Sequence, residues 1–191
     1  MNQIAKRFTS SLLLTALVLA VLAGTAGAAL AAPSALTPTV NPAAVVKPLS
    51  PVEAQGLLFM REEEKLARDV YAVLYQTWGL PIFQNIMQSE SQHMAAIKTL
   101  LDRYGLVDPA TPDQPGVFQN SALQALYAQL IASGSTSQRN ALLVGKLIEE
   151  TDIADLQLHL TETNHSDIRT VYSNLLKGSE NHLKAFTKQL R

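Results

Sequence analysis

The chain of 191 residues contains no cysteine. This absence excludes a disulfide scaffold, a thiolate zinc site, an iron–sulfur cluster and a cysteine nucleophile. Any metal that the protein binds must therefore be held by nitrogen and oxygen ligands.

An excess of charge of one sign is also missing. The chain has 15 Lys and Arg against 16 Asp and Glu, for a formal net charge of −1. Because duplex binding neutralises phosphates with a concentrated basic face, scattered charges of this kind argue against a nucleic-acid partner.

Long apolar runs are scarce, and the clearest one covers residues 12–23. Lys6 and Arg7 precede it, and the small-residue stretch Ala29-Leu30-Ala31 follows it. This pattern is typical of a secretory signal peptide, so we expect residues 1–31 to direct export to the periplasm or the medium. The alternative is an uncleaved signal segment, which would be the expected route of membrane attachment.

Residues 32–50 contain four prolines among small residues, with Lys47 as their single charge. Such a composition cannot bury a core and predicts an extended linker. The globular domain is therefore expected to comprise residues 51–191.

Helical signals dominate this domain, and no segment alternates apolar and polar residues as a half-buried strand does. Ser50-Pro51-Val52-Glu53 forms a capping-box pattern, and Gly79 supplies a stop, which predicts a helix over 51–77. A second helix is predicted over 81–104, before Gly105. The very short connection predicts antiparallel neighbours.

A long crossover follows, over residues 105–135. It contains three prolines and one short predicted helix, 122–132, capped by Ser121. Further helices are predicted over 136–163 and, capped by Asn164 or Ser166, over 167–190. The expected fold class is all-α, with four long helices and a crossover that contains the short helix.

Polar residues interrupt the apolar stripe of each long helix near its midpoint. Isolated buried carboxylates are costly unless a cation neutralises them, and helix midpoints in a bundle lie at similar heights. The sequence therefore predicts one shared metal site, whose candidate ligands are Glu64, Glu90, His93, Glu149, Asp152 and His182.

Each candidate also has a simpler reading. Glu64 belongs to the acidic run 62–64, and such runs usually form a solvated face, so only its phase in the helix selects it. Glu90 and His93 lie about 60° apart on one helical face, yet a lone pair of this kind is weak support. Asp152 could be a ligand, a hydrogen-bond acceptor behind the ligands or an exposed acid. His182 could be a core histidine with its hydrogen bonds satisfied.

The interrupted stripes resemble those of the ferritin-like di-iron carboxylate superfamily. The segments EEEKLARDVY, ESQHMAAIKTLLDRYG, VGKLIEETDIADL and VYSNLLKGSENHLKAF resemble the prokaryotic domain of unknown function 2202, over residues 53–190. The resemblance implies a ferritin-like four-helix bundle. It also implies a Tyr seven residues after the first ligand Glu, and Tyr71 has this spacing from Glu64 and could hydrogen-bond the site.

One position departs from the superfamily pattern. The second Glu-x-x-His motif requires an acid at position 179, and this chain has Ser179 there. Either Asp152 replaces that acid or one metal position is weak, so the expected content is one or two ions.

The leading functional hypothesis is an exported non-haem iron or manganese protein that acts on oxygen, peroxide or ferrous iron. Zinc and copper also suit the ligand types. The alternatives are a metal buffer or sensor without turnover and a helical interaction domain without metal. Trp78, Leu80 and Phe118 near helix ends could form an apolar contact in a homo-oligomer.

Overall fold

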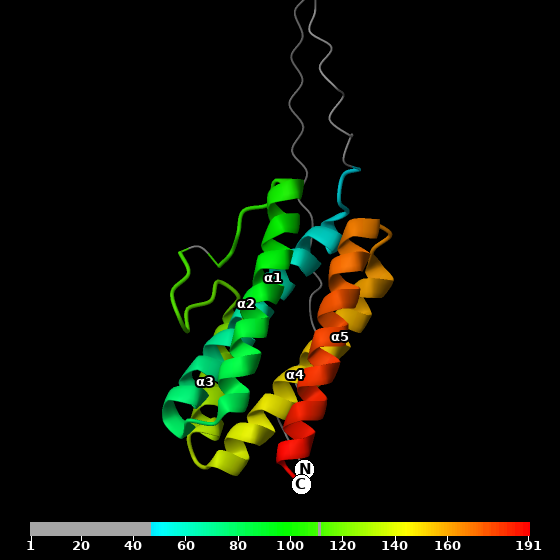
Figure 1. The fold of residues 1–191 in the computed structure, drawn as a ribbon. Helices are drawn as coiled ribbons and strands as arrows, with labels where there is room; N and C mark the ends of the chain where they lie inside the picture. The colour runs from blue at the N-terminus through cyan, green and yellow to red at the C-terminus, as the bar shows by residue number, and fades with distance from the viewer. Residues whose placement is uncertain (1–46, 111) are drawn as a thin grey trace, which may run out of the picture. The chain divides into compact units, whose positions relative to one another are not determined.

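A computed structural model describes residues 47–110 and 112–191 (Figure 1). This part of the chain folds into five helices and no strand, which confirms the all-α prediction. The helices are α1 (Pro51–Trp78), α2 (Pro81–Tyr104), α3 (Ser121–Gly134), α4 (Gln138–Glu162) and α5 (Ser166–Gln189). None of them has a stretch long and apolar enough to cross a bilayer. The expected signal peptide, 1–31, and most of the expected linker, 32–50, lie outside the described residues.

The ends of α1 follow the local sequence. The Ser50 hydroxyl accepts a hydrogen bond from the Glu53 amide, and the Glu53 carboxylate accepts one from the Ser50 amide at 2.8 Å. At the other end, Gly79 has a φ of 65°, a left-handed conformation that costs glycine little. Only residues 79–80 separate α1 from α2, so the two helices run antiparallel.

Three helix starts differ from the sequence-based expectations. Asn120 rather than Ser121 caps α3, because its side chain accepts hydrogen bonds from the amides of Ala122 and Leu123. Ser137 caps α4, which begins two residues later than expected. His165 occupies the cap position of α5 without a side-chain cap bond, so the predicted caps Asn164 and Ser166 are wrong.

The four long helices pack as a closed ring of neighbours. Helix α1 packs against α2 and α4, and α5 packs against α4 and α2. The backbones of the diagonal pairs α1–α5 and α2–α4 do not approach each other closely within the described residues. The short helix α3 packs on α1 and α4, at the end of the connector that leaves α2 at the top of the view (Figure 1).

The apolar core is divided in two along the helices. One cluster contains Tyr71, Leu74, Phe83, Ile86, Leu142 and Phe186 among others. The other contains Leu57, Met60, Ile97, Leu156, Tyr172 and Leu175 among others. Each fully buried side chain of this kind stabilises the fold by about 1.5–3 kcal/mol. The residues that interrupt the stripes lie between the two clusters in sequence on every long helix, as the sequence predicts.

The connector between α2 and α3 covers a face of α1 that the sequence analysis expected to be exposed to solvent. Glu62 accepts hydrogen bonds from the Gln119 and Asn120 amides, and Arg61 forms a two-pronged ion pair with Asp108. The expectation of a solvated acidic face is therefore wrong for Glu62, which is 4% exposed.

Phe118 is also buried beneath this connector. Its ring lies 4.4 Å from the Lys65 ammonium, and its exposed fraction is 7%. Phe118 therefore cannot belong to the apolar surface patch that the sequence suggested, whereas Trp78 and Leu80 stay partly exposed.

Candidate metal centre

The polar residues between the two apolar clusters form a polar layer, and Glu90 lies at its middle. Each oxygen of the Glu90 carboxylate faces an imidazole. Its Oε2 is 2.8 Å from Nδ1 of His93, one helical turn along α2. Its Oε1 is 2.9 Å from Nδ1 of His182, which α5 supplies. One carboxylate thus joins two imidazoles from different helices.

Each imidazole also lies close to a second carboxylate. Oε2 of Glu64 lies 3.2 Å from the His93 nitrogen, and Oε2 of Glu149 lies 3.4 Å from the His182 nitrogen. The ligand atoms within each triad lie within 4.8 Å of one another. The structure therefore brings together five of the six predicted ligands, as the triads Glu64–Glu90–His93 and Glu90–Glu149–His182.

The unpartnered atoms of this cluster fit a shared cation better than a closed hydrogen-bond network. Glu64 Oε1, Glu90 Oε1 and His182 Nδ1 are buried without a hydrogen-bond partner. The last two lie only 2.9 Å apart. Two ligand atoms bound to one ion at about 2.0–2.2 Å are separated by roughly 3 Å, so the spacing suits metal ligands.

Burial and charge set the protonation of the acids. Burial and the charge of Asp152 raise the pKa of Glu64 well above its ordinary range, despite the hydrogen bond from His93. Burial also raises the pKa of Glu149, to about 7. For Glu90 burial acts in the same direction, but the adjacent His182 and His93 imidazoles outweigh it and lower the pKa to about 2.

The two imidazoles are held in the charged form. Burial alone would lower the pKa of each ring, but the carboxylates oppose it. Glu64 and Glu90 raise the pKa of His93 to about 11, and Glu149 and Glu90 raise that of His182 to about 9. The metal-free cluster thus retains protons that bound cations would release.

Tyr71 and Ser89 form hydrogen bonds to two of the candidate ligands. The Tyr71 hydroxyl, which the sequence predicts beside the site, donates a hydrogen bond to Oε1 of Glu149 at 2.5 Å. Nε2 of His182 lies 3.1 Å from Oγ of Ser89. Hydrogen bonds of this kind fix the orientation of metal-binding carboxylates and imidazoles. The sequence analysis did not identify Ser89. A serine next to Glu90 in the sequence does not indicate that its hydroxyl contacts an imidazole.

Asp152 is buried beside the triads but belongs to neither of them. Burial raises the pKa of this carboxyl to about 8, and the nearby Ser179 hydroxyl opposes the shift. Ser179 is fully buried and donates its proton to the Leu175 carbonyl at 3.1 Å. Asp152 of α4 therefore lies next to position 179, where the superfamily pattern places an acid.

Two glycines allow the helices to approach closely around the cluster. A Cβ on Gly178 would lie 2.7 Å from Nε2 of His93, and a Cβ on Gly145 would lie 2.4 Å from the Phe186 ring. The sequence analysis identified no role for Gly178. A glycine inside a helical pattern was the available signal.

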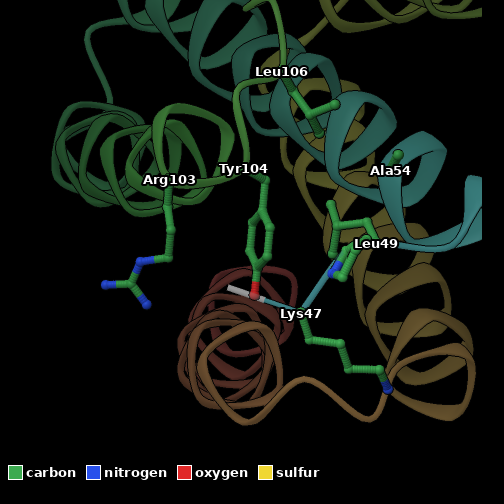
Figure 2. Close-up of a pocket in the computed structure, with 7 residues that line it drawn as sticks. Lys47, Leu49, Ala54, Arg103, Tyr104 and Leu106 are labelled. Atoms are coloured by element: carbon green, nitrogen blue, oxygen red, sulfur yellow. The ribbon is translucent and has the colours of Figure 1, made fainter. Parts of the chain in front are cut away.

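A separate surface pocket lies away from the carboxylates, where the chain enters α1 and leaves α2 (Figure 2). Its volume is about 310 Å³, and Lys47, Leu49 and Arg103 contribute to its lining. Figure 2 shows Tyr104 extending from the end of α2, and its hydroxyl donates to Asp167 of α5 at 2.9 Å. The pocket contains none of the candidate ligands.

A search of protein families matches residues 53–191 to the uncharacterized protein domain DUF2202. The match covers most of the chain and all five helices. The chain belongs to the DUF2202 family. A relative is the uncharacterized protein MJ0754 of Methanocaldococcus jannaschii, 50% identical over 144 residues, which are 75% of this chain and 78% of MJ0754.

Solved structures agree with this membership. The crystal structure of MJ0754 matches this DUF2202 protein with a TM-score of 0.75 and 50% identity, over 76% of this chain and 83% of the other. A DUF305 fragment from Deinococcus radiodurans gives a TM-score of 0.59 at 15% identity, over 75% of this chain and 98% of that one. The second match shows similarity of fold alone.

Proposed function

We propose that this DUF2202 protein is a ferritin-like metal protein that holds a pair of divalent ions between its four long helices. The observation that carries the proposal is the pair of ligand triads that share Glu90. The four long helices form a ring of adjacent pairs in which the backbones of diagonal helices do not approach closely, and this supports a four-helix bundle in which the connector crosses between α2 and α4.

The proposed ligands divide between two ions. Glu64 and His93 would bind one ion, Glu149 and His182 would bind the other, and Glu90 would bridge them. Carboxylate oxygens and imidazole nitrogens suit iron and manganese, and zinc and copper are compatible with the ligand types. Asp152 lies close enough to the triads to raise the pKa of Glu64, and it would compensate for Ser179.

An iron or manganese pair held there would supply electron transfer to oxygen or peroxide, or accept electrons from ferrous iron as a substrate. The chain's own residues would control protons around the pair. Tyr71 donates a hydrogen bond to Glu149, and the two imidazoles would lose their extra protons when the ions bind. With no cysteine in the chain, electrons would come from a separate donor.

Metal content is the first test. The wild-type protein is purified without chelator, reconstituted with iron, manganese, zinc or copper, and compared with His93→Ala and His182→Ala by elemental analysis. His159→Ala is the matched control, because His159 pairs with Glu162 and lies outside both triads. We expect about two ions per wild-type chain, retained in the control and reduced in both triad variants.

The other outcomes separate the alternatives. About one ion per chain would indicate a site truncated at Ser179. Bound metal without consumption of peroxide or ferrous iron would favour a buffer or sensor. No metal in the wild-type protein after reconstitution would contradict the proposal and favour a helical interaction domain. In that case, replacement of both triad histidines by Leu should preserve the fold and stabilise it.

A further inference from the structure

Glu63 is a buried acid that belongs to neither triad. It is 5% exposed, although the sequence placed it on a solvated face, and its Oε2 atom has no hydrogen-bond partner. The neighbouring cations are engaged elsewhere, because Arg61 pairs with Asp108 and Lys65 pairs with Asp69. Glu63 therefore carries its carboxyl into the protein without a cationic side chain beside it.

Two acids of α4 face Glu63. Asp155 lies within hydrogen-bonding distance of the Glu63 carboxyl and is partly exposed to solvent. Asp152 precedes it by three residues on the same helical face, is 5% exposed, and has an unpartnered Oδ1. The three carboxyls thus form a row between α1 and α4, with Asp155 partly exposed and the other two buried.

The inner end of the row reaches the triads. Asp152 lies one helical turn after Glu149, a member of the second triad, so the two carboxyls share one face of α4. His159 lies one turn after Asp155 at the outer end, and its imidazole pairs with Glu162 at 2.7 Å. Within the described residues, no ion pair links the row to a lysine or an arginine.

We propose that Asp155, Glu63 and Asp152 form an admission path that passes a divalent cation from solvent to the Glu90-centred triads. The inference rests on the proposed metal centre and adds the route by which the centre is filled. A row of acids between low-dielectric walls concentrates cations and raises their association rate by about 10-fold to 1,000-fold. Carboxylates alone suit a transient stop, whereas the triads add imidazole ligands that favour iron and manganese.

The test measures how fast the metal-free full-length protein takes up cobalt(II), whose visible absorption reports coordination without turnover. Glu63→Gln and Asp155→Asn are compared with wild type after rapid mixing. We expect each variant to load at least about tenfold more slowly and to reach the same final number of ions. Glu180→Gln is the matched control, because Glu180 is an exposed acid of α5 outside the row.

The outcomes separate this inference from the proposed function. Variants that load at the wild-type rate would overturn the path and leave the metal centre intact. A reduced final number of ions in Glu63→Gln would also overturn it, since Glu63 would then be a ligand. Failure of the wild-type protein to bind any metal would overturn the proposed function itself. Asp155→Asn changes a partly exposed side chain, so it keeps the test decisive if Glu63→Gln does not fold.

Discussion

At the scale of single residues, the candidate site depends on small differences in what surrounds like side chains. Glu149 and Glu150 are neighbours on α4, yet Glu149 is 1% exposed and faces His182, whereas Glu150 is exposed and pairs with Lys146. The helical phase of Glu149, which it shares with Leu142 and Leu156, predicts this difference from the sequence.

Replacement of Gly178 by alanine tests how closely α5 approaches His93. The added Cβ would lie 2.7 Å from Nε2 of the imidazole, so the ring must leave its present position beside Glu64 and Glu90. We expect metal affinity to fall about tenfold or more, even though alanine favours the helix by about 1 kcal/mol. Competition with a metal-sensitive dye measures the affinity. Lys177→Ala, at an exposed neighbouring position, should leave it unchanged. Unaltered affinity in Gly178→Ala would show that the ring has room to move.

Tyr71→Phe tests the hydrogen bond behind Glu149. The substitution keeps the aromatic packing with Phe83 and Phe186 and removes the hydroxyl that donates at 2.5 Å. We expect urea unfolding in chelator to show a loss of about 1.5–3 kcal/mol at pH 8, where Glu149 is ionised, and metal affinity to fall by about tenfold to 100-fold. Tyr75→Phe, one turn along α1, serves as the control. Wild-type affinity in Tyr71→Phe would contradict a supporting role for the hydroxyl.

At the scale of helices and connectors, α1 is buried on more than one face. Toward α2 and α4 it carries Glu64 and Tyr71, and toward the connector it carries Lys65 and Asp69. The Lys65 ammonium donates to Asp69 at 2.6 Å and to the Gln114 carbonyl at 2.7 Å. Asp69 also accepts from the Gly116 amide at 2.9 Å, so one buried ion pair fastens the connector to the helix.

Two Lys–Asp pairs of identical spacing allow a matched comparison. Lys65–Asp69 is buried on α1, whereas Lys98–Asp102 is exposed on α2. We expect Asp69→Ala to lower the free energy of unfolding by about 3–5 kcal/mol, because it leaves a buried ammonium without its partner. Asp102→Ala should change it by less than about 1 kcal/mol. Urea denaturation followed by circular dichroism measures both. Equal effects would mean that the connector does not shield the Lys65 pair from water.

At the scale of the whole molecule, the polar layer splits one core into two and links the stability of the domain to its protons. The cluster holds Glu64, Glu149 and Asp152 with raised pKa values beside two charged imidazoles. A polar layer of this kind is costly without cations, so the domain is expected to gain stability from the ions that would fill it.

The pH dependence of stability follows from these shifts. The pKa is raised to about 7 for Glu149, about 8 for Asp152 and about 9 for His182. A raised pKa stabilises the fold below the ordinary pKa of the group, and this contribution is lost as pH rises through the raised value. Glu90, lowered to about 2, acts in the opposite sense, but its contribution is lost only as pH falls below about 4.5.

We therefore expect the metal-free protein to lose stability between pH 5.5 and 8.5, by about 1.4 kcal/mol per pH unit for each extra proton of the folded state. Manganese should reverse this trend, because its binding improves as the ligands lose protons. Thermal unfolding in chelator and in excess manganese measures the two curves, and Glu90→Gln, without the shared carboxylate, should show no gain from the metal. If the stability of the wild-type protein changed with pH in the same way in chelator and in manganese, the expected coupling between metal binding and proton release would be contradicted.

The sequence by itself determined the helices and the positions of most candidate ligands. Helical phase placed Glu64, Glu90, His93, Glu149 and His182 on the inner faces, because their neighbours three and four residues away are apolar. Local signals also set the ends of α1, through the capping box at Ser50 and the left-handed Gly79. Helical phase and helix ends depend on residues close together in the chain, so they can be predicted from the sequence.

Only the tertiary structure decided which other residues share the buried layer. Glu62 and Glu63 are buried because the connector and α4 cover α1, and no local pattern states what covers a helix face. Ser89 and Gly178 matter through contacts with imidazoles, and each meets its imidazole on a different helix. Such contacts join residues distant in sequence, so they depend on how the helices pack. The packing also makes Glu90 the residue that both triads share.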